Sequence, residues 1–234
     1  MPNPMILFPG GLKKALTLSY DDGVEQDIRL IDIMNRSGLK GTFNLNSGEY
    51  APEGTVYPAG RVHRRMTEAE VTALYRDCGQ EVATHGLTHP FLDKMSVEEI
   101  KKEVQACTDK IIEITGEAPK FFRPPFIAVS QAMYDNIDMT FICGMGCEDW
   151  VPTVTAEQRA ERVLANAADG QIVLLHDMQW NQATVEALKT IIPELKKRGY
   201  DFVTVPRLFE RKNVTPRRGW LYTNVLQETS DNRL

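Results

Sequence analysis

Apolar runs rich in strand-forming residues alternate with amphipathic stretches along most of the chain. The first run, "ALTLSY", covers residues 15–20. Residues 25–37 follow it, with apolar side chains at helical spacing at Ile28, Ile31 and Met34. Because a strand leads directly into an amphipathic helix, the beginning of the chain predicts one β–α unit.

Capping boxes mark the starts of three further predicted helices. In each box a Ser or Thr stands three residues before a Glu or Gln, so that the two side chains can satisfy backbone N–H groups of the first turn. The three boxes are Thr67 to Glu70, Ser96 to Glu99 and Thr155 to Gln158. The last two helices are expected to end near Gly116 and Gly170, and a new apolar run follows each.

Seven short runs qualify as strands once these helices are placed. They read, in chain order, "ALTLSY", "GTFNL", "QEVAT", "KFFR", "TFIC", "QIVLL" and "DFVTV". Alternation of strands with helices is typical of a parallel sheet covered by helices, either doubly wound or closed as a barrel.

A single domain over residues 1–234 fits this pattern, because no linker, low-complexity tract or break in composition interrupts it. Its core is expected over residues 14–206. Two segments depart from the alternation, namely the long loop 46–65 and a polar tail over residues 211–234. The loop is long enough to have a function of its own, and the tail can dock, fray or contact a partner.

Composition narrows the classes of partner. The 234 residues carry a formal net charge of −5, which predicts no surface for a polyanion, so nucleic acid is not expected as a partner. No window approaches the roughly 18 consecutive apolar residues of a membrane span. The beginning, "MPNPMILFPGG", lacks the features of a signal peptide, which predicts a cytoplasmic protein, although a chain trimmed of its export signal would look the same.

Polar side chains gather where the predicted strands end. They are Asp21 and Asp22 after the first strand, His85 and His89 after the third, Arg123 at the fourth, Asp149 beyond the fifth and His176 after the sixth. The carboxyl ends of parallel strands meet at one edge of the sheet, where ligands bind in proteins of this class. These side chains are therefore expected to converge on one site.

The stretch "HGLTH" is typical of a metal site. Its two imidazoles, His85 and His89, stand four residues apart, and with one carboxylate they would form a three-ligand site that leaves a position open for water. A histidine pair of this spacing also occurs in proteins without a metal, where the two rings are solvated or hydrogen-bonded. A carboxylate that can join the pair therefore favours a metal site. The adjacent aspartates, Asp21 and Asp22, otherwise read as a turn before a helix, but one can bind a cation while its neighbour accepts a proton from water.

Arg123 and His176 suit such a site as partners of carboxylates. A guanidinium can hold a free carboxylate in place and in its ionised form. A histidine that acts as a protonated acid needs an orienting carboxylate, which Asp149 or Asp177 can supply. Taken singly, each residue also has an ordinary explanation, as a surface arginine before a turn and as a histidine at a strand end.

Two other features suggest chemistry less strongly. Cys143 and Cys147 form a C-x-x-x-C pair, which would suit a structural zinc or a redox pair, but no second pair at zinc-finger spacing accompanies them. The four cysteines are too few for a disulfide scaffold, so reduced thiols are the simpler expectation. Trp150 and Trp180 are ordinary core or rim aromatics unless a cleft exposes them to sugar rings.

Five short motifs in order make the chain resemble the polysaccharide deacetylases with a NodB-homology domain, carbohydrate esterase family four. The motifs read "SYDDG", "HGLTH", "RPPF", "EDW" and "LLHD", and the resemblance runs from about Leu16 to Val205. It implies an α/β fold, an irregular (β/α) barrel of about seven parallel strands, in agreement with the strand count above.

The resemblance also implies a role for each acid and base. Asp21 would be the catalytic base, and Arg123 would hold it in place. His176 would be the general acid, with Asp149 tuning it.

Metal and substrate contacts are implied by the same resemblance. Asp22, His85 and His89 would bind one divalent metal ion, with zinc expected first and cobalt or nickel as alternatives. The backbone N–H of Phe126 would stabilise the oxyanion, and Trp150 with Leu174 would line the acetyl pocket.

The implied reaction is metal-dependent removal of acetyl groups from an acetylated carbohydrate, either an N-acetyl amino sugar or an O-acetyl xylan. A catalytically silent carbohydrate-binding barrel and an amide hydrolase of a small non-sugar substrate are the alternatives. Gly86 stands where the second motif usually has Ser or Thr, which removes a hydroxyl that would support the metal loop. Phe126 replaces the usual Tyr, a change that leaves a backbone role intact. The oligomeric state is not predicted.

Overall fold

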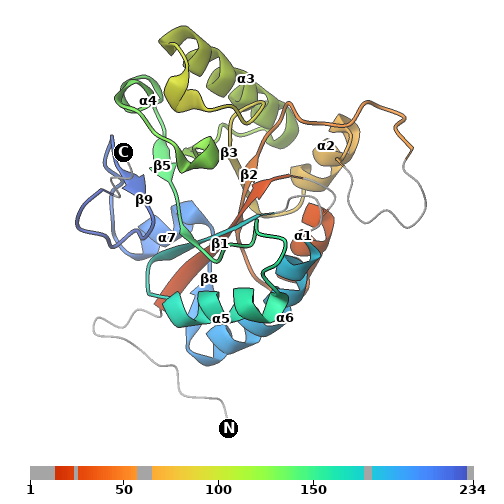
Figure 1. The fold of residues 1–234 in the computed structure, drawn as a ribbon, viewed down its shortest axis with the longest axis vertical. Helices are drawn as coiled ribbons and strands as arrows, with labels where there is room; N and C mark the ends of the chain where they lie inside the picture. Colours follow the sequence, from red (N-terminus) through yellow and green to blue (C-terminus); the bar gives the residue numbers. More distant parts are fainter. Residues whose placement is uncertain (1–13, 24–25, 57–64, 177–180, 231–234) are drawn as a thin grey trace.

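A computed structural model describes residues 14–23, 26–56, 65–176 and 181–230. Within these ranges, nine strands join one sheet in which every pair of neighbours is parallel (Figure 1). The strands are β1 (Lys14–Asp22), β2 (Thr42–Leu45), β3 (Glu81–Thr84), β4 (Phe121–Phe122), β5 (Thr140–Ile142), β6 (Met145–Gly146), β7 (Gln171–His176), β8 (Tyr200–Phe202) and β9 (Leu221–Tyr222). Their order in the sheet is β6-β7-β1-β2-β3-β4-β5-β9, and β8 pairs with the beginning of β1.

In the described part of the chain, seven α-helices connect or flank these strands and cover the outside of the sheet (Figure 1). They are α1 (Gln26–Arg36), α2 (Glu68–Arg76), α3 (Val97–Thr115), α4 (Gln131–Asn136), α5 (Ala156–Asn166), α6 (Gln182–Lys197) and α7 (Val205–Arg211). Two 3-10 turns, Leu92–Lys94 and Pro125–Ile127, follow β3 and β4. None of the described helices is long and apolar enough to cross a membrane. This arrangement confirms the predicted irregular (β/α) barrel.

All seven predicted strands are present. The prediction for "DFVTV" extended too far, because the strand ends at Phe202 and Val205 already begins α7, with a proline in its first turn. The strands β6 and β9 were not predicted. Each is only two residues long, which is too short for apolar alternation to show in the sequence.

The three capping boxes form as the sequence predicts. In α2, α3 and α5 the cap hydroxyl accepts from the third backbone N–H, and the Glu or Gln side chain accepts from the N–H of the cap residue. α3 ends at Gly116 in the left-handed conformation, with φ of 78°. One assignment within α1 was wrong, because Ile28 is 42% exposed and the buried stripe is formed by Leu30, Ile31 and Met34.

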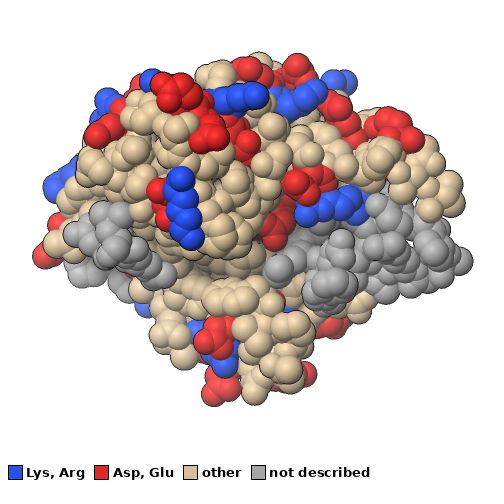
Figure 2. Space-filling model, turned by 45° about the horizontal axis from the view of Figure 1, so that its top comes forward, with Lys and Arg blue, Asp and Glu red and all other residues tan. Residues whose placement is uncertain are grey.

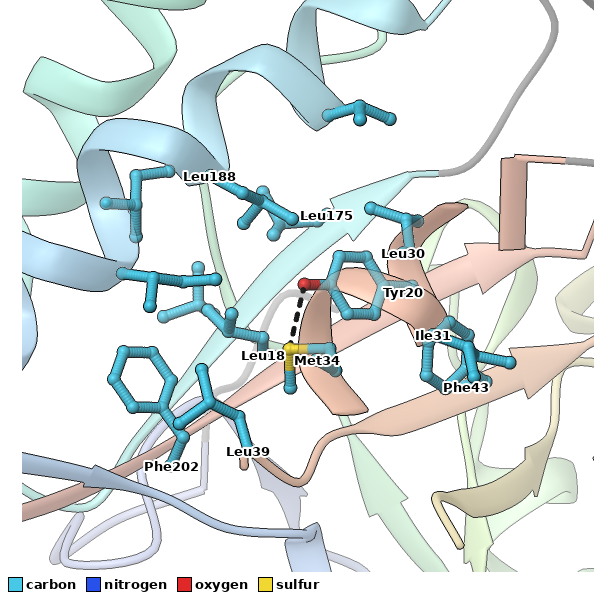
Figure 3. Packing of buried hydrophobic residues seen from close by; sticks show 14 of the residues in the cluster. Leu18, Tyr20, Leu30, Ile31, Met34, Leu39, Phe43, Leu175, Leu188 and Phe202 are labelled. Carbon is cyan, nitrogen blue, oxygen red and sulfur yellow. Dashed lines mark hydrogen bonds between the residues drawn. The ribbon is translucent and has the colours of Figure 1, made fainter. Parts of the chain in front are cut away.

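The largest hydrophobic core lies between the central strands and helices α1 and α6 (Figure 3). Leu18 and Tyr20 of β1 meet Met34 of α1 there, and the Tyr20 hydroxyl lies 3.9 Å from the Met34 sulfur. Leu188 of α6 and Leu175 of β7 belong to the same cluster. The core therefore anchors β1 and β7 side by side, and their carboxyl ends carry polar residues.

The chain after α7 closes the space between β5 and β7. β9 pairs with β5, and next to it the N–H of Ile172 in β7 donates to the carbonyl of Thr223 at 3.0 Å. β6 fills the same space nearer the carboxyl end of β7. The structured barrel thus extends beyond residues 14–206, the core predicted from the alternation. The sequence left open whether the tail docks, frays or contacts a partner, and its described part docks on the sheet.

Acidic and basic side chains of the described residues are interspersed over the face shown in Figure 2. Several exposed ion pairs of the described residues join side chains within one helix, such as Lys189 with Glu186 and Arg207 with Glu210. Exposed pairs of this kind contribute only about 0–1 kcal/mol each, so the stability of the fold rests on the buried clusters.

Candidate active site

The predicted site residues converge at the carboxyl edge of the sheet. Asp21 and Asp22 end β1, and His176 ends β7 directly beside Asp21 in the strand register. His85 follows β3 and Arg123 follows β4. Residues that are more than 150 positions apart in the sequence, Asp21 and His176, are brought together because β1 and β7 are parallel neighbours.

A buried ion pair lies at the centre of this edge. Arg123 Nη1 donates to both oxygens of Asp21, at 3.1 and 3.0 Å, and both residues are at most 1% exposed. Arg123 Nη2 donates to Ser19 Oγ at 2.8 Å, and Asn44 Nδ2 donates to Asp21 Oδ1 at 2.7 Å. The Asp21 carboxylate is therefore held in one orientation by two side chains.

The environment of Asp21 suits a base. Burial raises the pKa of the Asp21 carboxyl above its ordinary value, and the Arg123 guanidinium only partly offsets this rise. A carboxylate with a raised pKa accepts a proton more readily than an exposed one, while the adjacent cation keeps it available in the ionised form.

Asp22, His85 and His89 can hold a metal ion. One ligand atom from each lies within 4.8 Å of the others. The Nε2 atoms of His85 and His89 are 3.8 and 3.9 Å from Asp22 Oδ1. Two ligands of a tetrahedral ion with bonds of about 2.1 Å are roughly 3.4 Å apart, so the three atoms fit a zinc-sized ion after small movements.

The tautomer of His85 agrees with a ligand role. Its Nδ1 lies 2.7 Å from the carbonyl oxygen of Arg123, which can only accept, so Nδ1 carries the proton. The Nε2 lone pair then faces Asp22. Burial lowers the pKa of His85 to about 3, which keeps the ring neutral, the form that binds metals.

Backbone strain concentrates in the same place. Asp22, His89 and Phe126 have positive φ angles of 90°, 57° and 58°, in a region that residues other than glycine adopt at a cost. Such conformations persist where surrounding contacts hold them, and they cluster at functional sites. The Phe126 ring lies against His89, with ring centroids 4.4 Å apart, and stacks on Phe91 at 3.9 Å.

His176, at the end of β7, the strand next to β1, forms a second pair with Asp149. His176 Nδ1 lies 2.8 Å from Asp149 Oδ1, and the His176 N–H donates to Asp149 Oδ2 at 2.6 Å. Burial opposes protonation of His176, but the carboxylates around it, Asp149 first and then Asp21 and Asp22, together raise the pKa of His176 to about 9. The imidazole is therefore protonated at neutral pH, as a general acid requires. Asp177, the alternative partner, lies outside the described residues.

Trp150 and Leu174 lie beside His176. The Trp150 and His176 ring centroids are 5.5 Å apart, with the rings edge to face at 70°, and Trp150 is 48% exposed. Leu174 is buried two residues before His176. Gly146 packs against the same indole, since a Cβ atom at position 146 would lie at an ordinary contact distance of 3.4 Å from the Trp150 ring.

The cysteine pair does not belong to the candidate metal group. Cys143 and Cys147 are both buried, and no disulfide bond joins them. Among the described residues, one group of at least three potential ligands could hold a metal ion, and it consists of Asp22, His85 and His89. Trp180 lies outside the described residues.

Sequence reasoning missed several polar residues that hold the catalytic candidates. Thr184 Oγ1 donates to Asp149 Oδ2 at 3.0 Å, and Asn181 Nδ2 lies 3.3 Å from the same oxygen. Asn44 was also missed, although a buried asparagine in the apolar run "GTFNL" was a signal, because such a group needs a partner. No comparable signal marked Asn181 and Thr184, which lie near the beginning of α6.

Known proteins are similar to most of this chain in sequence and in fold. A family model described as polysaccharide deacetylase matches residues 10–140. The bifunctional xylanase/deacetylase of Pseudobutyrivibrio xylanivorans is 38% identical over 205 residues, 87% of this chain and 32% of that protein. The chain thus spans about a third of the length of this relative.

Two solved structures have the same fold. The Xyl-CE4 domain of a multidomain xylanase from the hindgut metagenome of Trinervitermes trinervoides is 38% identical, with a TM-score of 0.80, and the match covers 91% of this chain and 98% of that one. A family 4 acetyl xylan esterase from Clostridium thermocellum, in complex with a cobalt ion, is 33% identical, with a TM-score of 0.79, over 92% of this chain and 100% of that one.

Proposed function

Because the chain belongs to the polysaccharide deacetylase family, we propose that it hydrolyses acetyl groups of an acetylated carbohydrate and releases acetate. The observation that carries this proposal is the position of the Asp21–Arg123 pair beside Asp22, His85 and His89. His85 Nε2 is 3.8 Å from Asp21 Oδ2 and 3.8 Å from Asp22 Oδ1, so a base and a set of metal ligands share one location.

Asp22, His85 and His89 would hold a divalent ion, for which zinc is proposed first and cobalt or nickel as alternatives. When bound, such an ion polarises a carbonyl and makes a water molecule more acidic. Cobalt in the Clostridium thermocellum structure supports a site of this type. Imidazole and carboxylate ligands suit several divalent ions, so the ligand set alone does not distinguish them.

The remaining groups would act on the proton and on the acetyl group. Asp21, oriented by Arg123 and Asn44, takes a proton from the attacking water. His176, oriented by Asp149, donates a proton to the sugar oxygen or nitrogen as the bond to the acetyl carbon breaks.

Binding of the acetyl group is proposed on the same edge of the sheet. Phe126 follows the two prolines after Arg123, and its backbone N–H is proposed to donate to the developing oxyanion. Trp150 and Leu174 would line the pocket for the acetyl methyl group next to His176.

Xylan is the proposed carbohydrate. The three similar proteins described above are named for xylanase, xylanase/deacetylase or acetyl xylan esterase activity. Acetate release from acetylated xylan should return when zinc or cobalt is added to metal-free protein, and release from N-acetyl-chitooligosaccharides should be lower. The reverse preference would contradict xylan as substrate. Absence of release from both by metal-loaded protein would contradict the deacetylase activity.

The proposed acid leads to a prediction about pH. His176 must be protonated to act, so activity is expected to fall as pH rises through the pKa of His176. This pKa is about 9 without a metal, and a bound cation would lower it by offsetting the charges of Asp21 and Asp22. In Asp149→Asn the main cause of the raised pKa is removed. The basic limb of the pH profile of kcat should therefore shift to lower pH, and an unshifted limb would exclude His176 as the acid that Asp149 tunes.

A further inference from the structure

The two imidazoles lie on an irregular loop, residues 85–89, here called the imidazole loop. The loop has no helix or strand of its own after β3 ends at Thr84. Two of its residues have positive φ angles, Gly86 at 81° and His89 at 57°. A loop in such a conformation keeps its ligand atoms in place only if outside contacts hold it.

Asn46, at the beginning of loop 46–65, holds the first half of the imidazole loop. Its Nδ2 donates to the carbonyl oxygens of His85, at 2.7 Å, and Gly86, at 3.1 Å. The Asn46 backbone N–H donates to the carbonyl of Asp22 at 3.4 Å. Asn46 is only 4% exposed, and it donates directly to the backbone of two of the three candidate ligands, Asp22 and His85.

Gly48 and Glu103 hold the second half. The Gly48 N–H donates to the carbonyl of Leu87 at 2.9 Å, and a side chain at position 48 would come within 2.8 Å of that carbonyl. Glu103 of α3 accepts from the N–H and the hydroxyl of Thr88, at 2.5 and 2.9 Å. Each residue from 85 to 88 is therefore held by a residue from another part of the chain.

We propose that Asn46, Gly48 and Glu103 are positioning residues that fix the imidazole loop so that His85 and His89 converge on Asp22. This gives the beginning of loop 46–65 a function in metal binding, and it explains how the loop stays ordered with glycine at position 86. The proposal rests on the metal requirement of the proposed function. Partners that orient metal ligands typically change metal affinity by about 10- to 100-fold when they are removed.

Cobalt binding to the metal-free chain of 234 residues tests the proposal, since the bound ion absorbs visible light. Zinc affinity is measured in the same variants by competition against a chelator. Asn46→Ala and Gly48→Ala should weaken binding by about 10- to 100-fold. Glu103→Ala should weaken it as well, whereas Glu103→Gln should bind nearly as tightly as the original protein, because its amide oxygen can still accept from Thr88.

Matched variants separate positioning from general damage. Asn35 also donates its amide to a backbone carbonyl, that of Cys78 just before β3, at the opposite edge of the sheet, so Asn35→Ala should leave cobalt binding unchanged. His85→Ala should abolish tight binding. Circular dichroism and thermal unfolding of the metal-free proteins show which variants fold, and Glu103→Ala, which changes a partly exposed side chain, keeps the test open if Asn46→Ala does not fold.

The results of these binding experiments distinguish failure of the positioning role from failure of the proposed function. Unchanged cobalt affinity in folded Asn46→Ala and Glu103→Ala, together with loss in His85→Ala, would overturn the positioning role and leave the proposed function intact. Failure of the original protein to bind cobalt or zinc would remove the metal requirement of the proposed function, and the positioning role with it. Acetate release that returns in Asn46→Ala at high cobalt concentration would support a role in metal affinity rather than in chemistry.

Discussion

Asp21→Asn is expected to lower acetate release by about 10²- to 10⁴-fold while the protein keeps its metal, since an amide cannot take a proton from water. The substitution preserves the shape of the side chain, and its carbonyl oxygen can still accept from Arg123 and Asn44. Kinetics of acetate release at saturating cobalt, together with metal analysis of the same sample, check both parts of the expectation.

The neighbouring aspartate provides the matched control. Asp22→Asn removes a negatively charged ligand and should lower metal content, whereas Asp21→Asn should not. The two substitutions make the same chemical change at adjacent positions, so different effects on metal content would separate the base from the ligand. An Asp21→Asn protein that turns over substrate at the original rate would show that another group accepts the proton.

Arg123→Met is expected to lower the free energy of unfolding by roughly 3–5 kcal/mol, because it leaves the Asp21 carboxylate buried without its cation. Methionine is unbranched and apolar but two atoms shorter than arginine, so the loss combines removal of the charge with a packing contribution. The Arg123 carbonyl that accepts from His85 belongs to the backbone and remains. Urea unfolding of the metal-free protein, monitored by circular dichroism, measures the loss.

A double variant tests the cause. Arg123→Met combined with Asp21→Asn removes both charges, and replacing a buried ion pair by neutral groups is often close to neutral for stability. The double variant should therefore regain most of the stability that Arg123→Met loses. Arg123 Nε is itself buried without a hydrogen-bond partner among the described residues, which adds to the cost of keeping this arginine in the core. Additive losses in the double variant would indicate a packing defect instead.

The fold could be predicted well from the sequence because its signals are local. Apolar runs, capping boxes and terminal glycines each lie within a few residues, and β1 and α3 follow from them directly. The two-residue strands β6 and β9 could not be predicted, because only their hydrogen bonds to β7 and β5 make them strands. Their pairing is a property of the assembled barrel.

The residues of the site also fall into those that the sequence could place and those that it could not. Asp21, His85 and His176 could be placed at one edge because parallel strands carry their carboxyl ends together. Arg123 and Asp149, which orient Asp21 and His176, could be placed there as well. Asn46 and Asn181 could not be placed, since they donate to backbone carbonyls, and any residue type can offer a carbonyl. A sequence shows which side chains can do chemistry more readily than it shows which ones hold them.

The closure of the sheet by residues 221–225 has a consequence for the order of events during synthesis. The chain emerges from its N-terminus, so β1, β2 and β3 are available to pair first. The segment that lies between β5 and β7 is made last among the strands. Until it emerges, β5 and the first residues of β7, which β6 does not reach, lack a partner on this side in the nascent chain, even though every proposed catalytic residue has already been translated.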